Sequence, residues 1–378
     1  MKKLIYSFAF FFFFQITNAQ VNYESFNSSK LGEKRDLKIL LPRGYNQDDK
    51  TEYPLVIVLD GDYLFEPIIG NIDYQSYWDD MPECIVVGVK QADTRDLDFL
   101  YNDETNFPAH EGASFFEFIG MELIPHIEDS YNVANFRMVV GHDLSANFLN
   151  YFLFKEFPIF KAYISLSPDF APEMETRLLE KLSVLQEDTF YYLATADDDV
   201  SALQKKIVAA NELIKDIENP KLHYRFDNFQ DANHYSLVGL GIPKAINEIF
   251  TLYKPINKLE YKEKLLTYEE GPYNYLVKKY DDIKLFYGFE KKPIENDFRA
   301  VAAAAKKLEN MEALESLSKM ARKEYPDSMI SAYYMGMYFE EKGNIKRALQ
   351  YYQSGILLNP SEFIDKDMLL EKTYELKE

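Results

Sequence analysis

The stretch Val139-Val140-Gly141-His142-Asp143-Leu144-Ser145-Ala146-Asn147 decides the fold of this chain. An apolar run leads into a tight turn, and an apolar helix is expected to follow. This is the context of a G-x-S-x-G turn, which raises one side chain above the edge of a sheet. The raised position carries Asp143, where such a turn normally carries serine. The sequence therefore predicts the turn and leaves open whether residue 143 takes part in any chemistry.

Strand-like and helix-like segments alternate on both sides of this turn. Amphipathic helices are expected at 115–129 and 203–217, where apolar residues recur at helical spacing. Short β-rich runs occur at 37–41, 55–59, 84–89, 137–140, 162–166, 190–194 and 222–226. The alternation predicts an α/β fold with a mostly parallel sheet covered on both faces. We expect the first one or two strands to pair antiparallel at an edge.

Residues 1–19 have the features of a signal peptide. Lys2 and Lys3 precede the apolar run Leu4–Phe14, and small residues end at Ala19. The run is too short for a stable transmembrane helix, and no second run is long enough. We therefore expect an exported protein, periplasmic or secreted, without a transmembrane segment. The net charge of −20 argues against nucleic acid or an anionic membrane surface as a partner.

A smaller helical module is expected at the carboxyl end. Residues 254–294 have the composition of a helical connector, and Pro326 and Pro360 lie one tetratricopeptide period apart. Gly336 allows close helix approach, and Ala348 and Tyr352 fall at the small and aromatic packing positions of such a repeat. Residues 295–378 are thus predicted to form tetratricopeptide-like repeats and a cap that lean on the first domain. A protein-binding groove and a purely structural extension both remain open.

Several segments of the first domain resemble one family. Arg35–Tyr45 has the pattern of an opening strand followed by L-P-x-G-Y, and Tyr53–Gly61 that of Y-P, a strand and L-D-G. Phe115–Tyr131, Gly141–Leu144 and Asn233–Ser236 match later motifs in the right order. Together they resemble the "Putative esterase" family of α/β-hydrolases, which includes ferric-enterobactin, esterase D-like and feruloyl esterases. The resemblance implies an α/β-hydrolase domain over residues 20–253 and cleavage of a small-molecule carboxylic ester.

The resemblance also implies a catalytic trio. Its nucleophile position is Asp143, and its histidine is His234. Its acid should follow the strand at 190–194, where Asp197, Asp198 and Asp199 cannot be separated by sequence. Asp198 is our choice among the three.

Two backbone N–H groups should bind the oxyanion in such a site. One is that of Leu144, next to the turn. The other belongs to the loop near Asp62 or Tyr63, with Tyr63 as our choice. The remaining histidines lack metal-ligand spacing, so no metal ion or cofactor is expected.

Aspartate at position 143 changes the chemistry that the turn can support. An aspartate is already ionised near neutral pH, but its attack on an ester would give a mixed anhydride. Carboxylate nucleophiles are suited to attack on saturated carbon, as in dehalogenases. A dehalogenase needs a tryptophan after the nucleophile to bind the leaving halide, and this chain has Leu144 there. Ser145, two residues into the helix, is disfavoured as a displaced nucleophile. Three alternatives stay open: an esterase with some activity, an inactive pseudo-esterase that binds ligands or partners, and, least favoured, a polysaccharide- or siderophore-associated enzyme that uses Asp143 on saturated carbon. A stable Asp143–His234 ion pair would favour the second.

Overall fold

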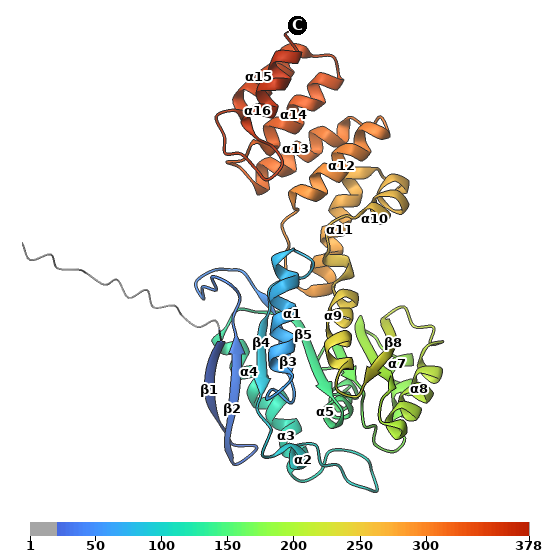
Figure 1. Ribbon diagram of the computed structural model, residues 1–378. Coiled ribbons are helices and arrows are strands. Elements are labelled where there is room, and N and C mark those ends of the chain that lie inside the picture. Colours follow the sequence, from blue (N-terminus) through green and yellow to red (C-terminus); the bar gives the residue numbers. More distant parts are fainter. Residues whose placement is uncertain (1–20, 378) are drawn as a thin grey trace, which may run out of the picture.

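The computed structural model describes residues 21–377, and one sheet of eight strands forms its centre (Figure 1). The strands are β1 (Val21–Ser28), β2 (Glu33–Leu40), β3 (Tyr53–Val58), β4 (Ile85–Val89), β5 (Val133–His142), β6 (Ala162–Leu166), β7 (Thr189–Asp198) and β8 (Leu222–Asn233). Their order in the sheet is β1-β2-β4-β3-β5-β6-β7-β8. β1 pairs with β2, and β2 with β4, in antiparallel fashion, and all other pairs are parallel.

This arrangement confirms the predicted α/β fold and its antiparallel edge. The sequence pattern did not predict β1, which is the outermost strand. Most of its side chains are exposed or only half-buried, because only one of its two edges is paired. A strand in that position needs no apolar run, so hydrophobic pattern cannot reveal it.

Helices cover both faces of the sheet, as predicted. α1 (Phe65–Tyr77) and α9 (Leu237–Ile249) pack on one face. The other face holds α3 (Glu111–Phe118), η1 (Ile119–Leu123), α4 (Ile124–Ser130), α5 (Leu144–Phe148), α6 (Asn150–Leu153), α7 (Met174–Ser183) and α8 (Ser201–Ile214). The short α2 (Arg95–Asp98) follows β4. Alternate residues of each strand enter the two cores, so Val56 and Val58 lie in one and Leu55 and Ile57 in the other.

The helix expected at 115–129 is interrupted by the π-helical turn η1. Pro125 is the second residue after this turn. Proline has no N–H and crowds the carbonyl four residues earlier, so a regular α-helix cannot pass through it without distortion. The wider turn preserves the direction of the helix and keeps Phe118, Leu123 and Ile127 in the core.

The carboxyl-terminal segment is entirely helical and stacks beyond one end of the sheet (Figure 1). It comprises η2 (Thr251–Tyr253), α10 (Lys258–Glu263), η3 (Leu265–Thr267), α11 (Pro272–Tyr287), α12 (Glu295–Lys307), α13 (Glu312–Glu324), α14 (Met329–Glu341), α15 (Ile345–Gly355) and α16 (Lys366–Glu375). A side chain on Gly336 would meet the buried ring of Tyr352 at 2.4 Å, so glycine there allows α14 and α15 to pack closely.

The helical segment contacts the sheet where β5 begins. The ring of Tyr287 lies 5.3 Å from that of Phe136, and the Tyr287 hydroxyl donates to the Ile249 carbonyl at 2.8 Å. The Lys291 ammonium lies 2.8 Å from the Asp79 carboxylate just after α1. The amino ends of the parallel strands therefore face the helical segment, and their carboxyl ends lie at the opposite edge of the sheet.

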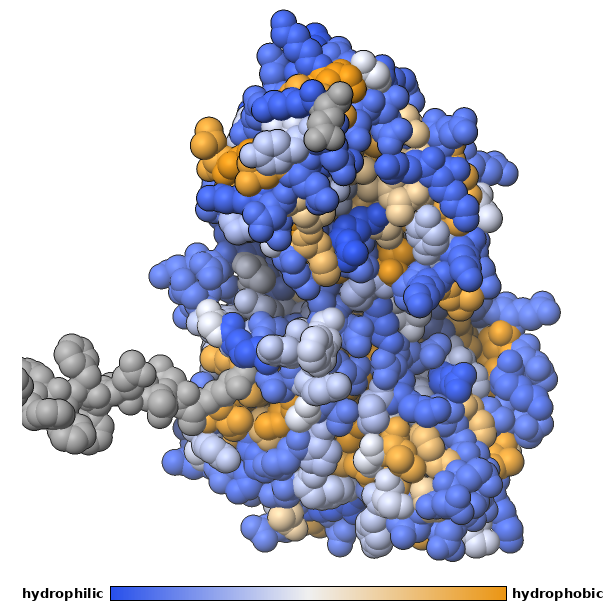
Figure 2. Space-filling model, turned by 45° about the horizontal axis from the view of Figure 1, so that its top comes forward, coloured by the Kyte–Doolittle hydropathy of each residue, from blue (hydrophilic) through white to orange (hydrophobic). Residues whose placement is uncertain are grey.

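The visible surface is mostly hydrophilic, with apolar side chains in small separate patches (Figure 2). Within residues 21–377 no helix combines the length and the apolar character needed to cross a membrane. The predicted signal peptide lies outside the described residues.

Candidate active site

Asp143 occupies the turn between β5 and α5, as the sequence predicted. Its backbone is strained, with φ 61° and ψ −119°. Gly141 permits this turn, because a side chain there would come within 2.6 Å of the Ser145 backbone. The buried Ser145 hydroxyl accepts from the His142 N–H at 2.8 Å and donates to the His142 carbonyl at 2.9 Å. Ser145 therefore holds the turn together and is not a displaced nucleophile.

The Asp143 carboxylate forms an ion pair with Arg95, a residue that the sequence reasoning missed. The Arg95 Nη2 lies 3.3 Å from Asp143 Oδ2. The same guanidinium contacts both oxygens of the buried Asp60, with Nε at 2.7 Å from Oδ1 and Nη2 at 3.1 Å from Oδ2. Burial lowers the pKa of Arg95, but the Asp60 carboxylate outweighs it and keeps the pKa above its usual value. Arg95 is thus a fixed cation beside residue 143.

One sequence signal points to Arg95. It follows β4, whose carboxyl end lies at the same edge as that of β5. Polar residues just after parallel strands gather at such an edge. The signal does not show which carboxylates the guanidinium would contact.

His234 pairs with Asp199. Its Nδ1 lies 2.9 Å from Asp199 Oδ1 and 3.0 Å from the Ser167 hydroxyl. The fully buried Asp199 carboxylate also accepts from Ser167 and Thr195 at 2.7 Å each and from the Val200 N–H at 2.8 Å. Burial alone would raise the pKa of Asp199, but these hydrogen bonds, that from His234 first, lower it from 3.8 to about 2.

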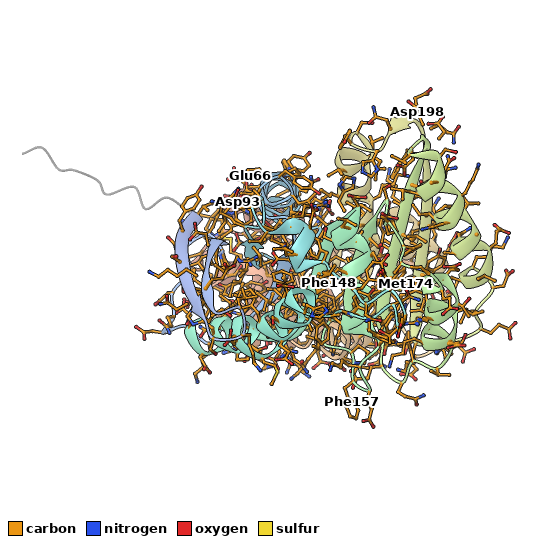
Figure 3. All side chains as sticks on the ribbon, turned by 90° about the horizontal axis from the view of Figure 1, so that it is seen from below. Glu66, Asp93, Phe148, Phe157, Met174 and Asp198 are labelled. Carbon is orange, nitrogen blue, oxygen red and sulfur yellow. The ribbon has the colours of Figure 1, made fainter. Side chains whose placement is uncertain are left out.

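The choice of Asp198 as partner of the histidine is wrong. Asp198 ends β7 with an exposed side chain at the rim of the molecule (Figure 3). The pairing of β7 with β8 shifts register between Ala196 and Asp198, and the chain turns inward directly afterwards. Asp197 accepts the Asp231 N–H at 3.2 Å, so it supports the loop before His234. Only the fold separates these neighbours.

No ion pair within 4.0 Å joins Asp143 to His234 in the described part of the chain. The buried His142 lies against the histidine instead, with ring centroids 4.4 Å apart, and its Nε2 donates to the His234 carbonyl at 2.9 Å. Its Nδ1 lies 3.1 Å from the Tyr63 hydroxyl. Burial, and then the nearby His234, lower the pKa of His142, which favours a neutral ring that positions the loop.

Of the two N–H groups expected to bind the oxyanion, one is available and the other already has an acceptor. The N–H of Leu144 starts α5, where the helix itself provides no acceptor, so this group is available. The N–H of Tyr63 donates to the Asp60 carbonyl at 3.1 Å, so the choice of Tyr63 is wrong. Within residues 21–377 the N–H of Asp62 has no acceptor, and Asp62 is the remaining candidate of this loop. The hydrogen bond of the Tyr63 N–H closes the turn that begins at Asp60, whose φ is 52°.

Among residues 21–377, no group of three or more His, Cys, Asp or Glu side chains is placed to hold a metal ion. In the part of the chain that the structure describes, the site brings together one acid–histidine pair, the N–H groups of Leu144 and Asp62, which have no acceptor, and a cluster of Arg95 with two carboxylates. The first two parts can support acyl chemistry at a carbonyl.

Comparisons with known proteins agree with this geometry. The family described as "Putative esterase" matches residues 28–221. The crystal structure of an uncharacterised protein from Capnocytophaga ochracea is 30% identical, with a TM-score of 0.82, over 95% of this chain and 99% of that one. An IroE-like serine hydrolase from Shewanella oneidensis is 18% identical, with a TM-score of 0.61, over 80% and 99% of the two chains. The BES protein from Bacillus cereus is 21% identical, with a TM-score of 0.53, over 65% and 98%. A search of the curated proteins finds no match.

The matched segment includes the turn at residue 143 and the buried Asp199, and the 30% identical structure extends through the helical module. This chain therefore belongs to the esterase family, with an α/β-hydrolase-like sheet and an all-helical carboxyl-terminal region.

Proposed function

We propose that this protein binds carboxylic ester ligands at the carboxyl edge of its sheet without forming an acyl-enzyme. The observation that carries the proposal is the ion pair between Asp143 and Arg95. In a serine esterase, the group at this position is a neutral hydroxyl that gives its proton to the histidine. Here it is an anion held by a fixed cation, 3.3 Å away, that is itself anchored on Asp60.

Two physical reasons oppose attack by Asp143 on an ester. Pairing with a guanidinium lowers the energy of the carboxylate and so reduces its nucleophilicity. The product of the attack would be a mixed anhydride, which is less stable than the ester from which it formed. Both reasons favour the pseudo-esterase alternative, in which the site retains recognition groups and lacks a nucleophile.

A slow hydrolysis by activated water is a second candidate, and the Asp199–His234 pair favours it. In this route His234 Nε2 accepts a proton from water while the water oxygen attacks the carbonyl carbon. The Leu144 N–H would stabilise the resulting oxyanion. The imidazolium, stabilised by Asp199, would then return the proton to the departing alkoxide. Residue 143 takes no covalent part in this route.

The test uses the purified protein, a short p-nitrophenyl ester and a fluorophosphonate that labels activated serines. We expect the natural protein to resist labelling, because it has no activated hydroxyl at residue 143. Asp143→Ser should become labelled and should gain turnover, since Asp199 and His234 are already in place. Labelling of the natural protein, or ester turnover that Asp143→Asn abolishes, would contradict the proposal.

The same assay distinguishes the two candidates. Turnover by the natural protein that His234→Ala removes and Asp143→Asn retains would favour activated water. Ligand binding without turnover, measured by calorimetry with the hydrolysis-resistant amide of the same acid, would favour a pure binding protein. Tyr63→Phe serves as a matched control, since it removes a hydroxyl from the site and leaves the acid–histidine pair intact.

We further propose that the protein is exported, as residues 1–19 suggest, and that residues 295–378 form a tetratricopeptide-like partner surface. The contact of Gly336 with Tyr352 supports the repeat assignment. This surface lies at the end of the sheet opposite the candidate site, so a partner there would leave the site accessible. Mass spectrometry of the mature amino terminus would test export. Crosslinking of the full chain, compared with a variant altered at the exposed Tyr374 of α16, would test the surface.

A further inference from the structure

An apolar groove lies on the face of the sheet covered by α3, η1 and α6, and none of its lining residues belongs to the candidate site. Its volume is about 460 Å³, within the range of small-molecule sites. One wall comes from α3 and η1, the other from α6 and the turn after it, and the loop before α3 closes one side. The walls include Phe107, Ala113, Phe116, Gly120, Phe154 and Ile159.

Small residues keep the groove open, and packed rings fix its walls. A side chain on Gly120 would come within 3.3 Å of Ile159 Cδ1, so glycine leaves room at the centre. The Phe116 ring stacks on Phe152 with centroids 4.6 Å apart. The Phe107 ring contacts that of Phe154 at 6.4 Å. These contacts give the walls a defined shape before any ligand enters.

The charges at the rim favour an anion. The one carboxylate that lines the groove, Glu117, is paired with Lys30 at 2.7 Å. The Lys155 ammonium lies 5.0 Å above the Phe116 ring, and no acid within the described residues lies within ion-pair distance of it. The Lys181 ammonium donates to the Lys155 carbonyl at 2.6 Å. Glu156 is the acidic residue next to these lysines in sequence, and its side chain is exposed. Within the described residues, Lys155 is therefore a cation without an acidic partner, and it lies beside an aromatic cavity.

We propose that this groove binds a small monocarboxylate with an apolar body. The carboxylate would meet Lys155, and the apolar part would lie between Phe116 and Phe154. Burial of the apolar part supplies most of the binding free energy, because an exposed charge pair contributes little. The positive charge of Lys155 makes the groove bind an anionic ligand in preference to a cationic one. This site is separate from the one formed by Asp143 and His234.

The test compares three probes of equal chain length, decanoate, decanol and decylammonium, by calorimetry on the full chain. We expect decanoate to bind most tightly and decylammonium least. Lys155→Glu should weaken decanoate by about 2- to 5-fold, as expected for an exposed charge pair, and strengthen decylammonium. Lys346→Glu, an exposed lysine of the helical module, is the matched control and should change neither probe.

Filling the groove gives an independent readout. Ala113→Phe should abolish decanoate binding, and Gly120→Leu serves the same purpose should the first variant fail to fold. Ala113 and Gly120 line this groove and lie outside the candidate active site, so loss of decanoate binding in either variant assigns the ligand to the groove. Equal binding of decanoate and decylammonium to the natural protein would overturn the proposal, as would full decanoate binding by a folded groove-filling variant. A change of oligomeric state in Ala113→Phe without binding of any probe would identify the groove as a contact between copies and would also overturn it.

Discussion

Replacing Asp199 by asparagine should destabilise the protein by about 2 kcal/mol at pH 7. The magnitude follows from the pKa of Asp199, which is about 2 in the folded chain against 3.8 for a free carboxyl. Each tenfold change in proton affinity corresponds to about 1.4 kcal/mol, so the folded state favours the ionised carboxylate by about 2 kcal/mol. Asparagine keeps the shape of the side chain but removes this charge-dependent part. It also presents an N–H₂ group to a site that holds four donors.

The sign of the pH dependence follows from the lowered pKa. A carboxyl whose pKa is depressed by folding stabilises the native state fully above its unfolded pKa. That contribution to stability is lost as the pH falls through the pKa of the carboxyl in the folded state. The difference between the natural protein and Asp199→Asn should therefore be constant above about pH 5 and shrink between pH 4 and pH 2.

Urea unfolding followed by circular dichroism measures this difference at several pH values. Asp198→Asn is the matched control, because the neighbouring side chain is exposed, and it should change stability by less than about 0.5 kcal/mol. Equal effects of the two substitutions at pH 7 would refute the pairing of Asp199 with His234. A pH-independent loss in Asp199→Asn would show that packing, and not charge, is what the carboxylate supplies.

Three further substitutions test the turn, the ion cluster and the helical module. Arg95→Met leaves the buried Asp60 without its cation and should cost about 3–5 kcal/mol in urea unfolding, while a loss below about 1 kcal/mol would argue against the cluster. Gly141→Ala places a methyl group 2.6 Å from the Ser145 backbone and should lower stability by about 1–3 kcal/mol. In the control Gly239→Ala the methyl group meets nothing within 4 Å, so stability should stay the same or rise. Gly336→Ala meets the buried Tyr352 ring and should lower the melting temperature, and an unchanged value would mean that α14 and α15 separate freely.

The strand-to-helix turn and the alternation of elements were predictable because they depend on local pattern. An apolar strand before Gly141 and an apolar helix after it must be joined by a tight turn, and both segments can be recognised from their own residues. The antiparallel edge followed from the same reasoning. The π turn before Pro125 was not predicted, although proline provides a clear local reason for it.

The partner of His234 required the tertiary structure. Asp197, Asp198 and Asp199 are identical in type and adjacent in sequence, so a shift of strand register decides which one turns inward. The Tyr63 N–H was excluded only by its contact with the Asp60 carbonyl.

The sequence by itself determined the inner strands of the sheet, the strand-to-helix turn and the presence of a carboxylate at residue 143, but not β1 or η1. The fold alone decided that this carboxylate lies beside Arg95, which is 48 residues distant in sequence, and not within ion-pair distance of His234. The physical reason is that side-chain periodicity fixes the form of a segment within a few residues. The electrostatic partner of a charge depends on where strands far apart in the chain meet.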